Sequence, residues 1–136
     1  MTVATAVVPD ALVERLRQRA RRAEELRRLP AETMAELDES GLFNLLKPAR
    51  YGGRQAEFRS LLAPVRRLAH GCASTAWTAG FFALHNWMLA LFDREAQEEG
   101  FASKPFLASS PLAPPGAAPP STVASDSPGA GPGPLA

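Results

Sequence analysis

Apolar side chains recur every three or four residues through most of the first hundred positions, and this spacing predicts a succession of helices. The first is expected from Asp10, whose carboxylate makes it a suitable N-cap, to Leu29. Pro30 suits the first position of a second helix, because proline lacks the N–H that would otherwise stay unpaired there. Gly41 marks the end of that helix.

Two further helices and a short fifth one are expected beyond residue 56. The pattern over residues 57–70 predicts a third helix, with a kink or a late start at Pro64. Residues 74–92 predict a fourth helix that is apolar nearly all round, so it should lie at the centre of the fold. Asp93 is the expected N-cap of a short helix over residues 94–100.

The composition changes sharply in the last quarter of the chain. Nine of the 13 prolines lie between Pro105 and the end, and that stretch carries a single charged residue. Such a composition has no helical or strand period and no apolar run to bury. We therefore expect a flexible N-terminus over 1–9, an all-α domain over 10–104 and a disordered Pro/Gly-rich tail, divided into 105–120 and 121–136.

The charges indicate which classes of partner to expect, and the single cysteine indicates the cellular location. Lys and Arg number 15 and Asp and Glu 14, and the net charge of +1 gives no reason to expect nucleic acid or an anionic membrane as a partner. Seven arginines between Arg15 and Arg28 share their helix with glutamates, which favours a solvated helix face over a nucleic-acid-binding arm. One cysteine, Cys72, favours a cytoplasmic location and is expected to be a buried thiol.

Few residues in the sequence carry recognisable chemistry. The chain has no phosphate-binding glycine loop and no nucleophile elbow, and its two histidines are too isolated for a metal site. His85 stands out as a titratable side chain within the most apolar predicted helix. It is either a hydrogen-bonded core histidine or a ligand-binding residue of an apolar pocket. Trp77 lies eight residues earlier, so both side chains can face one side of the helix.

Four segments, in the same order, resemble one protein family. They are Arg-Leu-Pro at 28–30, Gly-Leu-Phe-Asn-Leu-Leu-Lys-Pro-Ala-Arg-Tyr-Gly-Gly at 41–53, Gly-Cys-Ala-Ser-Thr-Ala-Trp at 71–77 and His-Asn-Trp-Met-Leu-Ala-Leu-Phe at 85–92. The family is that of the acyl-CoA dehydrogenase-like flavoproteins. The resemblance is to its flavin-dependent monooxygenase branch, which includes the oxygenase components of 4-hydroxyphenylacetate and hydroxysteroid-ring hydroxylases.

This resemblance implies a fold of three parts: a helical N-terminal domain, which this chain would supply, a β-domain and a C-terminal four-helix bundle. Such enzymes hold reduced flavin, FMN or FAD, between the last two parts, are usually homo-oligomers, and in two-component systems use a separate flavin reductase. The tryptophan of the third segment lies near the flavin, and the histidine of the fourth contacts the phenolic substrate or the oxygenated flavin. By position, Trp77 is the expected cofactor-binding residue and His85 the expected catalytic residue, with no metal.

The tail departs from the family pattern. Residues 105–120 resemble the lead into the β-domain, where the family continues with a short hairpin, but residues 121–136 contain no alternating apolar run. Back-translated with suitable synonymous codons and read in another frame, the tail can encode Val-Asp-Gly-Gly-Val-Arg-Leu-Thr-Gly-Arg-Trp, which meets the hairpin pattern. We therefore hypothesise a one-base frameshift between about Gly116 and Ser121; the alternative is a natural Pro/Gly-rich tail.

The leading interpretation is the N-terminal part of a flavin-dependent oxidoreductase, a monooxygenase that uses reduced flavin and O₂ on an aromatic or similar small molecule. Two alternatives stay open: an acyl-CoA dehydrogenase proper, and a non-catalytic helical interaction module. The 136-residue chain alone is expected to be inactive and to hold no flavin stably, because the resemblance assigns most flavin contacts to the other two domains. Its apolar residues 74–92 are then expected to promote association.

Overall fold

The computed structural model describes residues 8–102 and 105–109 of the chain. Within these residues the chain forms helices and no strand, so the prediction of an all-α domain is confirmed. The α-helices are α1 (Asp10–Leu26), α2 (Ala31–Glu39), α3 (Leu62–Ala69), α4 (Ala73–Leu89) and α5 (Arg94–Ala102), and the 3-10 helices are η1 (Ala49–Tyr51) and η2 (Phe58–Leu61). The predictions for the Pro/Gly-rich tail from residue 110 onward and for residues 1–7 lie outside the described residues.

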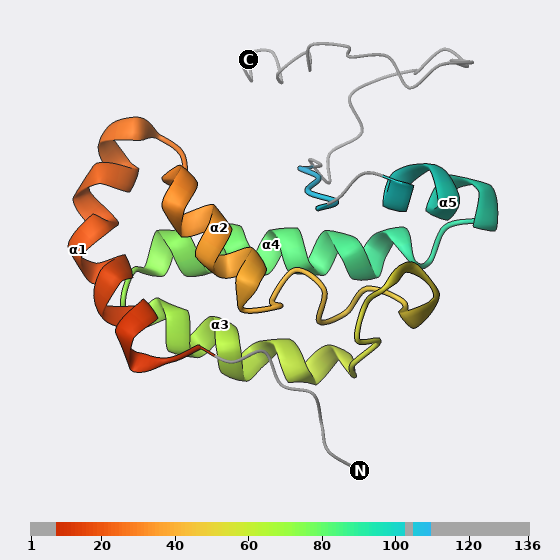
Figure 1. The fold of residues 1–136 in the computed structure, drawn as a ribbon, viewed down its shortest axis with the longest axis horizontal. Coiled ribbons are helices and arrows are strands. Elements are labelled where there is room, and N and C mark those ends of the chain that lie inside the picture. Colours follow the sequence, from red (N-terminus) through yellow and green to blue (C-terminus); the bar gives the residue numbers. More distant parts are fainter. Residues whose placement is uncertain (1–7, 103–104, 110–136) are drawn as a thin grey trace, which may run out of the picture.

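The core forms around α4, which runs through the middle of the molecule beside α3, with α1 and α2 toward one end and α5 at the other (Figure 1). Ala76, Ala79 and Ala83 are buried at helical spacing on one face of α4. Because alanine is small, neighbouring elements can approach this face closely. On the side toward α3, a Cβ added at Gly80 would stand 3.3 Å from Val65. These two faces of α4 therefore lie in the core, which confirms the predicted central position of the fourth helix.

Larger apolar side chains from the other elements fill the core. The segment after Gly41, which the sequence showed as a short apolar run, contributes several of them without forming a helix. The buried set includes Leu12, Leu16, Leu37, Leu42, Phe43, Leu45, Leu46 and Leu68. The core therefore combines side chains from distant parts of the sequence, which local periodicity does not specify.

Both ends of α1 differ from the sequence prediction. Pro9 occupies the N-cap position, so Asp10 is the first helical residue rather than the cap, and its carboxylate pairs with Arg67. Proline supplies no side-chain acceptor, and no side-chain hydrogen bond caps this end. At the other end Arg27 adopts a left-handed conformation with φ 52°, which stops the helix at Leu26, three residues earlier than predicted.

The end of α4 is held by a side chain from α5. The helix stops at Leu89, and Gln97 of α5 is buried. The Gln97 amide donates to the carbonyls of Ala90 (3.1 Å) and Phe92 (2.6 Å), and its Oε1 accepts a hydrogen bond from Arg50. These bonds satisfy carbonyl groups that the end of a helix leaves unpaired, and they explain why the helix ends before residue 92.

The predicted boundaries around α3 and α5 are largely confirmed. The third helix starts late rather than kinking, because η2 precedes it and Pro64 lies in the first turn of α3, where proline is tolerated. Gly71 follows α3 at a close approach to α1: a Cβ there would lie 2.4 Å from the carbonyl oxygen of Val13. Asp93 caps α5 as predicted, since its Oδ1 accepts from the N–H of Ala96 at 2.9 Å.

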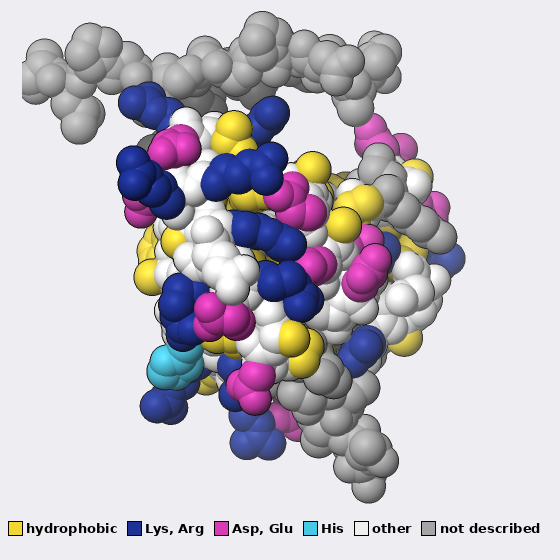
Figure 2. All heavy atoms as spheres, turned by 60° about the vertical axis from the view of Figure 1, so that its left-hand side comes forward, with side chains coloured by type: hydrophobic (Ala, Val, Ile, Leu, Met, Phe, Trp, Pro, Cys, Tyr) yellow, Lys and Arg dark blue, Asp and Glu magenta, His cyan; other side chains and the backbone are white. Residues whose placement is uncertain are grey.

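The face that α1 and α2 present to solvent carries basic and acidic side chains next to one another (Figure 2). Glu36 of α2 lies 2.7 Å from Arg15 and 2.7 Å from Arg19 of α1. Farther along, Glu32 pairs with Arg22 at 2.6 Å. The ion pairs link the two helices and neutralise part of the arginine charge, which fits the interpretation as a solvated helix face.

Candidate functional site

Three aromatic rings stand in one row along α4. Trp77, Phe81 and His85 are spaced four residues apart, so they project from the same face of the helix. The ring centroids of Trp77 and Phe81 lie 4.9 Å apart, and those of Phe81 and His85 lie 5.9 Å apart. The structure thus places the two residues singled out from the sequence in one row, joined by Phe81.

The two ends of this row differ in their exposure to solvent. The Trp77 residue is 69% exposed, whereas His85 is only 6% exposed. The buried Nδ1 atom of His85 has no hydrogen-bond partner among the described residues. Because an unpartnered buried polar atom is costly, Nδ1 marks a position where a bound molecule can complete a hydrogen bond.

A cavity of about 420 Å³ borders the row. Its lining consists of Trp77, Thr78, Phe81, Phe82 and His85 from α4, with Ala108 and Ser109 from the last described segment. A largely aromatic wall with a few polar groups, at this volume, is typical of small-molecule sites. The flat ring of Trp77 and the free Nδ1 of His85 fit one wall around a planar aromatic ring system, such as the expected flavin and its substrate.

Asn86 bonds to the segment that contributes Ala108 and Ser109 to the cavity, and it was not predicted from the sequence as a site residue. Its side chain is buried, and its Nδ2 donates to the carbonyls of Phe82 (3.0 Å) and Phe106 (3.2 Å). The second bond ties the segment 105–109 to α4. An amide side chain within an apolar helix is the signal that could have identified it, because a buried amide needs hydrogen-bond partners.

Cys72 precedes α4 at the N-cap position, and its thiol is buried, as predicted. Desolvation raises the pKa of this thiol, but hydrogen bonds with the side chains and backbone of Ser74 and Thr75 outweigh it and bring the pKa below its ordinary value. Cys72 does not line the cavity beside His85. The structure therefore places it outside the candidate site.

The remaining titratable groups do not assemble a metal centre in the part of the chain that the structure describes. Among residues 8–102 and 105–109, no three His, Cys, Asp or Glu side chains are grouped so that they could hold a metal ion. His70 is exposed at the end of α3 and does not join His85. In the same residues, no helix is both long and apolar enough to span a membrane.

Comparison with known proteins connects this geometry to a family. Residues 4–104 match the family described as acyl-CoA dehydrogenase, N-terminal domain. One relative is the oxygenase subunit HsaA of a flavin-dependent monooxygenase from Rhodococcus jostii, which is 46% identical over 66% of this chain and 24% of its own length. Another is the oxygenase component of an FADH(2)-dependent resorcinol hydroxylase from a Rhizobium species, 42% identical over 65% of this chain and 22% of its own length.

Solved structures agree with these matches. The crystal structure of the HsaA monooxygenase from M. tuberculosis superposes with a TM-score of 0.67 at 46% identity, over 71% of this chain and 25% of that one. The chain therefore spans about a quarter of the length of the relatives that it matches. The resemblance to the oxygenase components of flavin-dependent monooxygenases is confirmed by these relatives. The chain belongs to the acyl-CoA dehydrogenase family, and its residues 4–104 match the N-terminal domain of that family.

Proposed function

We propose that this chain is the N-terminal part of the oxygenase component of a flavin-dependent monooxygenase that hydroxylates an aromatic small molecule with reduced flavin and O₂. The observation that carries the proposal is His85, a buried imidazole that lines an aromatic-walled cavity and whose Nδ1 has no hydrogen-bond partner among the described residues. The functions of the relatives, flavin-dependent monooxygenase and resorcinol hydroxylase, support the same class.

In this proposal His85 binds the hydroxyl group of a phenolic substrate. Its Nδ1 accepts the phenol proton, which places electron density on the ring where oxygen is to be added. Trp77 offers an exposed, flat surface for the flavin ring, and the Phe81 ring lies between those of Trp77 and His85. Reduced flavin, when bound, supplies the electrons and the activation of O₂. The aromatic side chains that line the cavity reduce the access of water to the reacting groups.

The proposal extends to cofactor and partners. An oxygenase component requires reduced flavin, FMN or FAD, delivered by a separate flavin reductase, and we infer that the whole protein is a homo-oligomer. The described residues supply one wall of the flavin site, from one helix and a short segment. The 136-residue chain by itself is expected to be inactive and to hold flavin weakly, because the family resemblance assigns most flavin contacts to the β-domain and the C-terminal bundle.

A chimeric enzyme tests the role of His85. Residues 1–109 of this chain are joined to the remainder of the Rhodococcus jostii relative, which is 46% identical over the matched region. We expect His85→Ala to lower hydroxylated product per reduced flavin consumed by about a hundredfold or more, the usual range for removing an acid–base group. Flavin affinity should change much less. The measurements are product yield by chromatography and flavin binding by absorbance.

The matched control is His70→Ala, which removes the other histidine, exposed at the end of α3. It should leave product yield and flavin binding near the values of the unmodified chimera. Melting temperature is recorded for both variants on the same preparation. Normal hydroxylation by His85→Ala together with a lowered melting temperature would show a purely structural histidine and refute the proposed role.

A further inference from the structure

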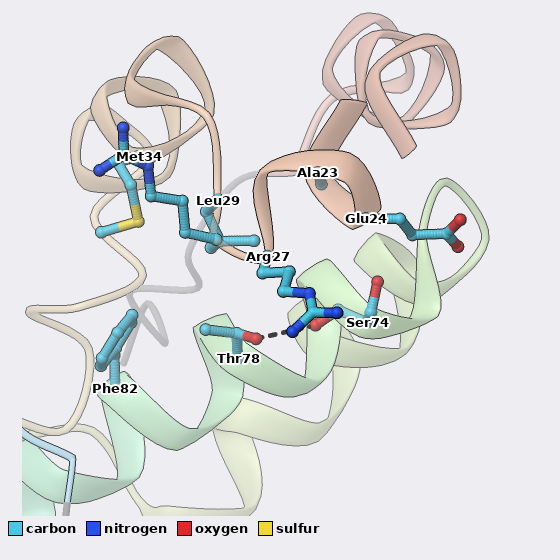
Figure 3. Close-up of a pocket in the computed structure, with 9 residues that line it drawn as sticks. Ala23, Glu24, Arg27, Leu29, Met34, Ser74, Thr78 and Phe82 are labelled. Carbon is cyan, nitrogen blue, oxygen red and sulfur yellow. Dashed lines mark hydrogen bonds between the residues drawn. The ribbon is translucent and has the colours of Figure 1, made fainter. Parts of the chain in front are cut away.

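A second cavity, of about 540 Å³, lies where the end of α1 and the start of α2 face α4 (Figure 3). We name it the α1–α2–α4 cavity and define it by Arg27, Arg28, Leu29, Met34 and Phe82. Its volume lies within the range of small-molecule sites, which is roughly 300–1,000 Å³. Phe82 also borders the cavity beside His85, but the arginines, Leu29 and Met34 do not.

One side of the α1–α2–α4 cavity is apolar and built on the core. Leu29, Met34 and Phe82 are partly buried and pack against the buried core cluster. They come from three separate parts of the chain, and Figure 3 shows them on the same side of the cavity as seen from Arg27. Because the core supports these side chains, they form a stable surface for an apolar ring.

The other side carries positive charge that no carboxylate among the described residues neutralises by an ion pair. Five of the seven arginines between Arg15 and Arg28 form ion pairs with glutamates. The remaining two, Arg27 and Arg28, form no ion pair within the described residues, and both line this cavity. Glu24 is also near, but Figure 3 shows its carboxylate pointing away from the Arg27 guanidinium, which lies over α4 beside Thr78. A guanidinium without a carboxylate partner favours an anionic ligand.

The backbone of Arg27 adds an independent observation. Its φ of 52° is left-handed, at a helix end where glycine is the usual residue. Among the described residues, the other non-glycine residue with a positive φ is Gln55, whose Oε1 accepts a hydrogen bond from the N–H of Ala49. The side chain of Arg27 makes no hydrogen bond within the described residues, and it lines the cavity. Strain of this kind is typical of functional positions.

We propose that the α1–α2–α4 cavity binds a small carboxylate with an apolar ring body. The ring lies against Leu29, Met34 and Phe82, and the carboxylate accepts hydrogen bonds from the guanidinium of Arg27. Arg28 adds positive charge at the rim. The proposal does not rest on the proposed hydroxylation, because neither His85 nor Trp77 lines this cavity, although Thr78 and Phe82 border both cavities.

The 136-residue chain can be tested with a matched pair of probes, 2-naphthoate and its uncharged analogue 2-naphthamide. The chain has three methionines, and two of them report on different cavities: Met34 lines the α1–α2–α4 cavity and Met88 lines an apolar hollow between η2 and the end of α4. Titration of methyl-labelled protein is followed by NMR. We expect 2-naphthoate to shift the Met34 methyl signal and to leave that of Met88 in place, with 2-naphthamide binding more weakly.

Arg27→Gly is the decisive variant, because glycine adopts the left-handed conformation freely and the fold should be retained. It should weaken 2-naphthoate binding about tenfold, the factor for losing one hydrogen bond to a charged group. Binding of 2-naphthamide should not change. Arg21→Gln, which removes an exposed arginine paired with Glu25, is the control and should change neither. Equal affinity for the two probes, unchanged 2-naphthoate binding in Arg27→Gly, or no shift of Met34 would overturn the proposal.

Discussion

His85 and Asn86 are neighbours in the sequence, both are buried in α4, and they differ in their hydrogen-bond partners. The Asn86 amide donates to two carbonyls, one of them in the segment 105–109, whereas Nδ1 of His85 has no partner in the described residues. Burial alone therefore does not separate a structural polar residue from a ligand-binding one. The difference lies in which polar atoms remain unpaired, because a buried polar group without a partner is unfavourable until a ligand supplies one.

Asn86→Ala tests the structural role of this amide. The change leaves the Phe106 carbonyl without its donor and should lower the free energy of unfolding by about 1–3 kcal/mol. The segment 105–109 should also be cleaved faster by chymotrypsin at Phe106. Urea denaturation and limited proteolysis measure the two effects.

Thr78→Ala serves as the control for Asn86→Ala, because the Thr78 hydroxyl donates only to Ser74 within the same helix. Its effect on the free energy of unfolding should stay within about 0.5 kcal/mol. Equal stability and equal cleavage rates for Asn86→Ala and the unmodified chain would contradict the role assigned to Asn86.

At the scale of helices, α1 and α2 are joined across their polar faces as well as through the core. Glu36 lies between Arg15 and Arg19, and its side chain is 24% exposed. Partial burial raises the pKa of this carboxyl, but the hydrogen bond from Arg19 and the charges of Arg19 and Arg15 outweigh it and hold the pKa below its ordinary value of 4.5. The ionised carboxylate therefore stabilises the contact between the helices. Arginines engaged in this way are less available to a partner, which weakens the case for an interaction module.

Glu36→Gln should lower the free energy of unfolding at pH 7 by about 1 kcal/mol. Since the folded-state pKa of Glu36 is depressed, its contribution is complete above the unfolded-state value and is lost as the pH falls through the folded-state value. The difference between the variant and the unmodified chain should therefore shrink below about pH 4. Urea denaturation across this pH range measures it.

Glu25→Gln is a suitable control for the pH experiment, because Glu25 pairs with Arg21 on the open surface of α1. It should change the stability little at any pH, as is usual for exposed ion pairs. A Glu36→Gln difference that stays constant from pH 7 to about pH 3 would exclude the proposed ionic contact.

At the scale of the whole molecule, the surface around the end of α4 is more apolar than expected for an isolated domain. Phe58, Leu62, Leu91 and Phe92 are exposed, and an apolar hollow of about 540 Å³ lies between η2 and the end of α4. The relatives are about four times as long as the segment that this chain matches. Large uncovered apolar patches favour association.

The isolated chain is therefore expected to self-associate in a concentration-dependent way. The double substitution Leu91→Lys and Phe92→Lys should shift the association to at least about tenfold higher protein concentration, because it places charge on the patch. Analytical ultracentrifugation measures the change. Leu26→Lys, at an exposed leucine at the end of α1, is the control and should leave the association unchanged. A chain that remains monomeric at millimolar concentration would exclude this role for the patch.

Much of the architecture is predictable from local features of the sequence. Helical spacing, Pro30, Gly41 and Gly71 place the main helices to within a few residues, and Asp93 caps α5 as expected. The row of Trp77 and His85 also follows from spacing. These features are predictable because helix formation and termination depend on backbone hydrogen bonds and on residues next to one another in the chain.

The sequence by itself determined the helical class, the order of the elements and the shared face of Trp77 and His85 on α4. Only the tertiary structure decided that His85 is buried with an Nδ1 that has no partner among the described residues while Trp77 remains exposed, and that Asn86 bonds to the Phe106 carbonyl. It also decided that Arg27, which forms no ion pair within the described residues, and Met34 line one cavity. The physical reason is that burial and hydrogen-bond satisfaction depend on partners supplied by distant segments, which local periodicity does not encode.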